Sequence, residues 1–520
     1  MQSFLQRFAS SIYGVLSGFD RVRFRGTQRM MANRRGLSRY LSFHSVLLKQ
    51  FKAFAQESTE QIKQDVTAQA AALGRPVVYL NDSHIRKEEV ALEMAQRHHV
   101  KEGLIGILSA VELCHSFTVG PNRATQKLEL RAQPTKCLHY YHYWLDRDLG
   151  LCHVRMQTWL PYTAFICVNG REMLARQLDR AGIGYVKRDN CFATVADVER
   201  AQEFLDAQVR WDWSARLQSL VAASHPHWDR WPGMDRPYYW SAEEVEWATD
   251  VMFRSRSALA TCMPRFVRHG LEVLHSADVL RFLGRKVPGH GGVNGRFTGE
   301  VDTHYTERPE GVRVRHRLNR NVVKMYDKQG SVLRIEAVTN DPRDMKVYRS
   351  KEGEPEGPKA WRRLRKGVAD LPRRTEVSQK CTERYLESLA TIEDSQPLGE
   401  LTDRVCKRTS WHGRPVRALQ PLATEDRTLL EAVGRGEFLL NGFRNRDLRA
   451  LLYQKPAADK AEEKKRSAKV TRQLRLLRAH GLVHKVPKTQ RYQVSPKGKT
   501  LLTALAAARA ADTVKLQGAA

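Results

Sequence analysis

The last hundred residues carry the pattern that most restricts what this chain can fold into. Val470, Leu474 and Leu477 recur at the spacing of one helical face, which predicts an amphipathic helix over 464–480. Gly481 follows, and the short runs Leu482–Val486 and Arg491–Val494, separated by a four-residue tip, then predict a two-stranded ribbon. A helix followed directly by a ribbon is therefore expected near the C-terminus.

Start and stop signals define the other helices of this segment. Thr424 before two acids predicts a helix start, and Gly434 its end, because acids are favourable at the positive end of a helix. Asn445 begins a second helix, and Ser495 followed by Pro496 begins the last one. Three helices, a ribbon and a closing helix are the parts of a winged helix-turn-helix.

The same segment is strongly basic. Between Lys464 and Lys499 there are 12 Lys and Arg residues and no Asp or Glu. A helix of this size fits a DNA major groove, and a ribbon beside it can contact backbone phosphates. The residues predicted to bind nucleic acid here are Lys465, Lys469, Arg472, Arg475, Lys485, Lys488 and Arg491.

The stretch VTRQLRLLRAHGLVHKVPKTQRYQVSPKG resembles the winged helices of MarR-type bacterial regulators. The resemblance covers the C-terminal segment and implies a DNA-binding module. Because winged helices also serve in replication initiators and in protein–protein docking, it identifies a module rather than a function.

Whole-chain composition agrees with an anionic partner. Lys and Arg number 87 against 57 Asp and Glu, a formal net charge of +30 over 520 residues. Such charge attracts either phosphate backbones or anionic lipid. No run of 18 apolar residues and no signal-peptide core occur, and the 8 cysteines include no C-x-x-C pair. These features predict a cytoplasmic, nucleoid-associated protein that neither crosses a membrane nor contains a zinc finger.

The chain as a whole is predicted to be a mixed α+β multidomain protein. The expected parts are an N-terminal α+β domain at 1–222, a middle domain of helices and a basic β-hairpin at 223–350, a charged helical connector at 351–420, and the winged helix at 421–520. Within the middle domain, Ser241 and Glu244 form a capping-box pattern that predicts a helix start.

The predicted β-hairpin has one apolar and one charged face. Strict alternation places Val312, Val314, His316 and Leu318 opposite Arg313, Arg315 and Arg317. Further on, Asp327 with Gly330 three residues later predicts a type I turn with a glycine bulge, pairing Asp327 with Ser331. In that register Lys324 faces Arg334 and Val322 faces Glu336. Two sets of side chains then share faces: Val323, Met325, Leu333 and Ile335 on one, and Lys324, Tyr326, Arg334 and Glu336 on the other.

The polar face has the residue types that phosphodiester chemistry needs. Two cations suit a phosphate, a tyrosine hydroxyl suits a nucleophile or donor, and a carboxylate suits a metal or a proton. The run is similar to rolling-circle replication initiators of plasmids and phages, matching at Tyr326, Asp327, Lys328, Arg334 and Glu336. That resemblance implies a transient tyrosine–5′-phosphate bond and a divalent metal.

Tyr326 and Glu336 are therefore the candidate catalytic residues, for metal-dependent strand nicking or transfer with Mg²⁺ or Mn²⁺. Arg313, Arg315, Arg317, Lys324 and Arg334 are candidate phosphate contacts. The family's pair of histidines flanking a hydrophobic residue has no clear counterpart. The alternative is an exposed hairpin with a surface salt-bridge cluster and no enzymatic role.

A cluster of cysteines and histidines occurs around a second predicted hairpin: Cys137, His139, His142, Cys152 and His153. His139 and His142 are three residues apart, so they point to opposite faces of a strand and cannot share one ion. No metal site is predicted. Tyr140, Tyr141, Tyr143 and Trp144 suit either a base-stacking platform or a strand core, and the core is favoured.

These patterns together predict a nucleic-acid-binding protein, with DNA favoured over RNA. Several basic surfaces suit a mobile-element replication or transposition protein. The alternatives are a winged-helix transcriptional regulator with a large N-terminal sensing domain and a non-catalytic RNA-binding protein. The sequence does not define the oligomeric state.

Overall fold

The computed structural model describes residues 1–511 except 83, 227–235, 286–300, 309–310, 352–353, 355, 393–397, 454 and 488. The chain forms a mixed α+β protein with two compact units, one made of 1–14, 249–337 and 377–520 and the other of 15–248 and 338–376. The four consecutive domains predicted from the sequence differ from this division, because segments far apart in the chain pack into each unit.

A mixed sheet of eleven strands is the main feature, with several small hairpin sheets beside it. Its strand order is β10-β11-β12-β13-β9-β1-β6-β5-β4-β3-β2. The strands are β1 (Ile12–Thr27), β2 (Val77–Tyr79), β3 (Gly103–Asn122), β4 (Lys127–Asp146), β5 (Gly150–Gln157), β6 (Ala164–Asn169), β9 (Tyr239–Phe253), β10 (Val301–Arg308), β11 (Gly311–Leu318), β12 (Asn321–Lys328) and β13 (Val332–Thr339).

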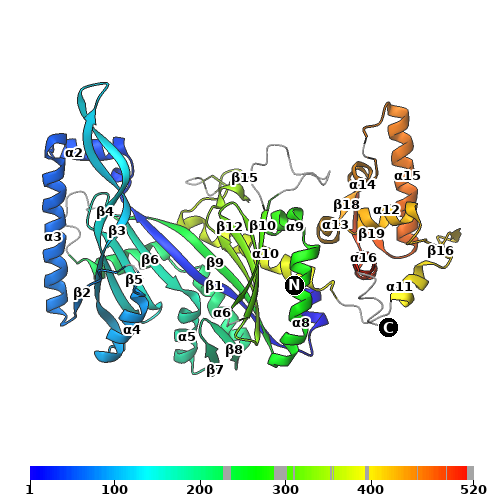
Figure 1. The fold of residues 1–520 in the computed structure, drawn as a ribbon, viewed down its shortest axis with the longest axis horizontal. Helices are drawn as coiled ribbons and strands as arrows, with labels where there is room; N and C mark the ends of the chain where they lie inside the picture. The colour runs from blue at the N-terminus through cyan, green and yellow to red at the C-terminus, as the bar shows by residue number, and fades with distance from the viewer. Residues whose placement is uncertain are drawn as a thin grey trace. The chain divides into compact units, whose positions relative to one another are not determined.

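Helices cover the sheet of the unit that contains 15–248. They are α2 (Arg34–Phe43), α3 (Phe51–Ala72), α4 (Lys87–Arg97), α5 (Gly170–Ala181), α6 (Val198–Val209) and α7 (Trp213–Ser224). Figure 1 shows α2 and α3, in blue, beside the long β3–β4 hairpin. Asp212 separates α6 from α7 and caps the start of α7 by accepting a hydrogen bond from the Ala215 amide.

The other unit has its own helices around the β10–β13 strands and in its C-terminal segment. They are α1 (Gln2–Arg7), α8 (Arg256–Arg268), α9 (Ser276–Phe282), α10 (Leu371–Leu389), α11 (Leu398–Val405), α12 (Thr424–Val433), α13 (Gly436–Asn441), α14 (Asn445–Leu452), α15 (Lys460–Ala479) and α16 (Pro496–Ala510). The first residues of α10, up to 376, belong to the unit that contains 15–248.

The small sheets of the two units are β7 (Tyr185–Arg188) with β8 (Cys191–Val195), β14 (Lys346–Arg349) with β15 (Ala360–Arg363), β16 (Thr409–Trp411) with β17 (Arg414–Val416), and β18 (Phe443–Arg444) with β20 (Arg491–Val494) and β19 (Val483–Lys485).

The prediction that a helix starts at Ser241 is wrong, because this segment forms strand β9. Trp240, Ala242, Val245 and Trp247 are buried on both sides of the strand, so the alternation that marks a half-exposed strand is missing. The Ser241 hydroxyl donates to the carbonyl of Arg25 (3.3 Å) instead of capping a helix.

The segment predicted as a charged connector also differs. It contains strand β15, which pairs with β14 just before the segment, and also α11 and the β16–β17 hairpin. Its longest helix is α10, whose Cys381, Tyr385, Leu386 and Leu389 are buried. No helix in the described part of the chain is both long enough and apolar enough to cross a membrane.

Candidate nucleic-acid interface

Helix α15 presents the basic surface expected from the sequence. Asp459 caps it by accepting from the Glu462 amide (2.7 Å), and Val470, Leu474 and Leu477 are buried as their spacing predicts. The cations of the other side, Lys465, Lys469, Arg472 and Arg475, are exposed. Apolar packing on one side thus fixes which charges face outward.

These cations have few acidic neighbours. Lys469 pairs with Glu425 of α12 (2.9 Å). Among the described residues, no ion pair involves Lys465, Arg472, Arg475 or Lys485. Four positive charges of this segment therefore remain for a partner.

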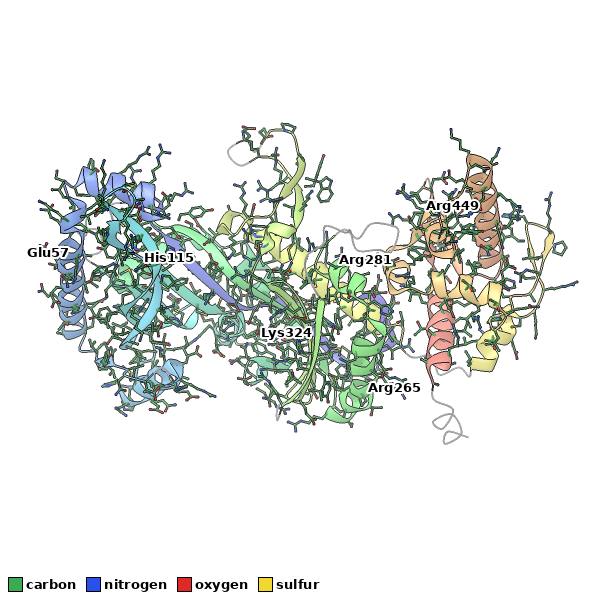
Figure 2. The ribbon with its side chains drawn as sticks, turned by 45° about the horizontal axis from the view of Figure 1, so that its top comes forward. Glu57, His115, Arg265, Arg281, Lys324 and Arg449 are labelled. Atoms are coloured by element: carbon green, nitrogen blue, oxygen red, sulfur yellow. The ribbon has the colours of Figure 1, made fainter. Side chains whose placement is uncertain are left out.

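The first turns of α15 are less basic than the rest. The helix begins at Lys460, earlier than predicted, and so includes Glu462 and Glu463. Glu462 pairs with Arg466 (2.5 Å), and Glu463 pairs with Arg449 of α14 (3.2 Å). Figure 2 labels Arg449. The uncompensated charge is consequently concentrated in the later turns.

A three-stranded sheet, two of whose strands follow α15, carries two more cations. Strand β20 lies between β18 and β19, with Phe443 opposite Tyr492 and Val483 opposite Val494. Lys485 and Arg491 are exposed on this sheet. Lys488 lies outside the described residues.

The β10–β13 strands separate charged from apolar side chains as expected. In the β11–β12 register Arg313 is opposite Tyr326 and Arg315 is opposite Lys324, so these four share a face, with Arg317 along it. Figure 2 labels Lys324 on this sheet.

On the reverse face, His316 is buried. Its ring nitrogens lie 3.0 Å from the Thr303 hydroxyl and 3.1 Å from the Tyr385 hydroxyl. Burial lowers the pKa of His316 to about 4, so the ring stays neutral at neutral pH.

The turn between β12 and β13 differs from the type I turn predicted. Gln329 and Gly330 both have positive φ, 59° and 74°, whereas a type I turn with a glycine bulge needs a positive φ at the glycine alone. The Gly330 amide donates to Asp327 (2.8 Å), and β13 starts at Val332. On the polar face of these strands, Lys324 contacts Glu336.

Tyr326, Lys324 and Glu336 form a compact polar group. The Tyr326 hydroxyl donates to Glu336 Oε2 (2.6 Å), and Lys324 Nζ lies 2.5 Å from Glu336 Oε1. Burial alone would raise the pKa of the Glu336 carboxyl, but the Lys324 charge and these hydrogen bonds outweigh it and lower the pKa. The two candidate catalytic residues are thus in direct contact.

Arg334 is not placed for phosphate binding. It is fully buried, and its Nε and Nη2 atoms lie 2.5 and 2.8 Å from the two carboxylate oxygens of Asp250 on β9. This bidentate pair satisfies the guanidinium inside the protein. We correct its assignment from a surface contact to a core ion pair, with Asp250 the partner that sequence patterns did not reveal.

The unit that contains 15–248 has a cleft of about 810 Å³ that sequence reasoning missed. Aromatic and basic side chains dominate its lining: Trp211, Trp213, Tyr238, Tyr239, Trp240 and Tyr348, with Arg210, Arg349, Lys351, Lys359, Arg365 and Arg373. Trp213, Tyr238 and Trp240 are buried, while Tyr348 is 59% exposed. The cleft therefore has a rigid aromatic floor and an accessible ring at its edge.

Asp370 organises the basic side of this cleft. It lies 3.3 Å from Arg349, 3.8 Å from Arg365 and 3.3 Å from Arg373. Because one carboxylate serves three guanidinium groups, the cleft keeps a positive balance. The sequence signals that could have located the cleft are the aromatic segment 225–240 and the basic run 361–366.

The histidines and tyrosines of β4 lie where strand alternation predicts. His142 contacts Gln69 (3.2 Å) on one face, while His139 lies on the other beside Cys137, so the two do not converge. Tyr140, Tyr141 and Tyr143 are buried, which confirms the core over the stacking platform. Cys152 and His153 follow on β5.

Comparisons with protein-family models, curated proteins and solved structures find no match to this chain.

Proposed function

We propose that this protein binds nucleic acid, DNA in preference to RNA, through its C-terminal segment acting as a winged helix-turn-helix. The observation that carries the proposal is the set of exposed cations on α15, of which Lys465, Arg472 and Arg475 have no acidic partner among the described residues. Because packing already fixes the helix backbone, neutralising phosphates has only to order the cationic side chains.

The element order supports the winged-helix interpretation. A strand (β18) precedes α14 and α15, and β19 and β20 follow them to make a sheet with β20 in the middle. In that arrangement α15 would lie in a major groove with Lys485 and Arg491 near the backbone. B-form DNA admits a helix in its major groove and A-form RNA does not, so DNA is favoured.

The direct test compares two charge-matched variants of the full chain. Arg472→Ala/Arg475→Ala should weaken binding to a labelled duplex at least tenfold in a gel shift. Lys49→Ala/Lys52→Ala removes the same charge from exposed positions on α3 and just before it, and should leave binding within about twofold. Equal affinity of the two variants would refute the proposal.

A second candidate activity, binding of an unpaired strand, is favoured by the aromatic and basic cleft. Bases stack on aromatic rings for about 1–3 kcal/mol each while cations follow the backbone. Tyr348→Ala should therefore weaken single-strand binding about fivefold or more and leave duplex binding unchanged. Tyr79, on β2 and also 59% exposed, provides the matched control Tyr79→Ala. If the two variants bound single-stranded nucleic acid equally well, a role of the cleft in single-strand binding would be refuted.

Handling both a duplex and an unpaired strand is what replication and transposition proteins of mobile elements require. We therefore place the protein in that class ahead of a transcriptional regulator. Strand nicking through Tyr326 would be its catalytic step, and Mg²⁺ or Mn²⁺ would be needed only for that step. A purely regulatory protein would bind the duplex without single-strand binding or cleavage.

A further inference from the structure

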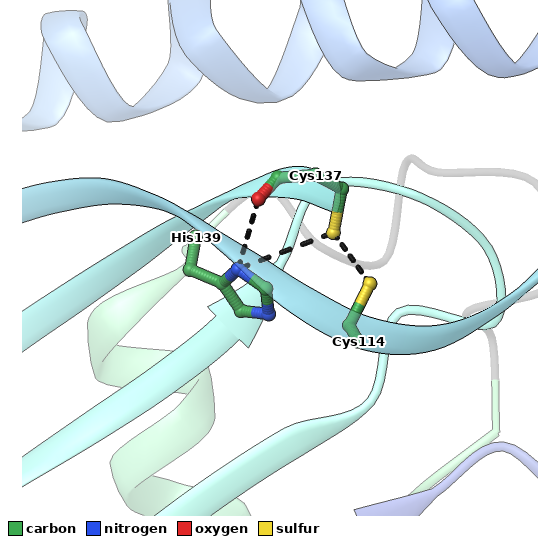
Figure 3. Close-up of side chains that lie close together, drawn as sticks. All are labelled: Cys114, Cys137 and His139. Carbon is green, nitrogen blue, oxygen red and sulfur yellow. Dashed lines mark hydrogen bonds between the residues drawn. The ribbon is translucent and has the colours of Figure 1, made fainter. Parts of the chain in front are cut away.

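Two cysteines and a histidine from β3 and β4 come together on one face of the hairpin. Cys137 is opposite Glu112, and Cys114 is opposite Thr135, so the two cysteines are diagonal neighbours on adjacent strands. His139 is two residues beyond Cys137 and projects to the same face. Figure 3 shows the three side chains turned toward one another.

The donor atoms lie within the reach of one small cation. The Cys114 and Cys137 sulfurs are 2.7 Å apart, Cys137 Sγ is 4.0 Å from His139 Nδ1, and all three donors lie within 4.8 Å of one another. Zinc bonds of about 2.3 Å to sulfur and 2.0 Å to nitrogen at a tetrahedral angle separate two sulfurs by about 3.8 Å and a sulfur and a nitrogen by about 3.5 Å. The observed sulfur–sulfur distance is shorter than the zinc value, and the observed sulfur–nitrogen distance is longer. Small side-chain rotations, with the backbone unchanged, would bring both to the zinc values.

The surroundings suit a bound dication. Cys137 and His139 are buried and Cys114 is partly exposed, which leaves one side for an ion to enter. The nearby cations Arg155 and Lys87 are paired with Glu112, at 2.8 and 3.1 Å. Two thiolates would balance a doubly charged ion, so the filled site would be neutral without recruiting these groups.

We propose that Cys114, Cys137 and His139 bind one Zn²⁺, with the fourth coordination position open. Two thiolates and an imidazole are a zinc donor set, and magnesium or calcium would require oxygen ligands. His139 Nδ1 also lies 3.1 Å from the Cys137 carbonyl, and it would exchange this contact for the metal. The ion would tie β3 to β4 by side chains in addition to the backbone ladder.

Sequence spacing did not reveal this site because Cys114 lies on the preceding strand. Only the hairpin register brings it beside Cys137. The zinc proposal does not depend on nucleic-acid binding, so an experiment that refutes one of the two proposals leaves the other standing.

The test uses the full chain purified under reducing, oxygen-free conditions. The metal-free protein is titrated with Co²⁺, and zinc content is measured after zinc loading and desalting. We expect one metal per chain and the intense visible bands of tetrahedral cobalt with thiolate ligands. Cys114→Ser and Cys137→Ser should each remove both signals, and His139→Ala should weaken metal retention.

Two controls separate ligand loss from misfolding. Cys406→Ser changes an exposed thiol and Cys152→Ser a buried one on the neighbouring strand, and both should retain one metal. Cys114→Ser affects the least buried ligand, and its circular dichroism should match that of the wild type. Wild-type protein with no tetrahedral cobalt spectrum, metal retained in Cys114→Ser, or a Cys114–Cys137 disulfide that persists under reductant would each overturn the proposal.

Discussion

The hydroxyl of Tyr326 donates a 2.6 Å hydrogen bond to Glu336, a carboxylate buried beneath the basic face of the β10–β13 strands. A carboxylate in this position can accept the proton of an attacking tyrosine, and Arg313 and Arg315 on the same face can hold a phosphate. The same contact would also exist in a purely structural cluster, so kinetics must distinguish the two.

Tyr326→Phe should abolish any covalent adduct with labelled single-stranded DNA in Mg²⁺ or Mn²⁺ while leaving the gel shift unchanged. Losing one hydroxyl removes the nucleophile and none of the cations that bind phosphate. Denaturing gels report the adduct, and Tyr305→Phe on β10 is the control. Adduct formation by the Phe variant, or none by the wild type, would eliminate the catalytic role.

The buried Asp250–Arg334 pair should be a strong stability determinant. Asp250→Ala leaves an uncompensated guanidinium in the core and should lower the free energy of unfolding by about 3–5 kcal/mol. Glu272→Ala breaks the exposed Arg268–Glu272 pair and should cost less than about 1 kcal/mol. Urea unfolding measures both, and similar losses would contradict the burial argument.

The free energy of unfolding should fall as the pH is lowered from 7 to 5, and protonation of His316 should account for part of this loss. Burial lowers the pKa of His316 to about 4 from an unfolded value near 6.5, so the unfolded chain binds more protons in this range. Stability is therefore fully present above the unfolded pKa and is lost as pH falls toward the folded one. His316→Gln should reduce the loss by about 2 kcal/mol. An unchanged pH dependence of the unfolding free energy would contradict this assignment.

The C-terminal segment should reach its full stability by itself only if it begins near Leu398. Leu401, Val405 and Leu419 belong to the same core as Val470 and other residues of the segment, so the boundary predicted at residue 421 removes part of that core. A fragment from 398 should unfold cooperatively when followed by circular dichroism. A fragment from 421 should unfold at a clearly lower temperature, and equal midpoints would restore the original boundary.

Local signals predicted the C-terminal elements well because caps, glycines and apolar spacing act within a few residues. The Ser495 cap, the α15 apolar face and the β19–β20 ribbon needed no knowledge of tertiary contacts. Strand β9 was missed because burial on both sides removes alternation. Asp250, the aromatic cleft and Cys114 were missed for another reason: their partners lie on other strands or segments, and only the fold brings them together.

The most direct test of the central claim is the salt dependence of duplex binding by the full chain and by Arg472→Ala/Arg475→Ala. If α15 neutralises phosphates, log K should fall steeply and linearly with log salt, and the double variant should lower the slope by about two because each lost phosphate contact removes about one. An affinity that does not change with salt, or an identical slope and affinity in the variant, would contradict nucleic-acid binding through this helix.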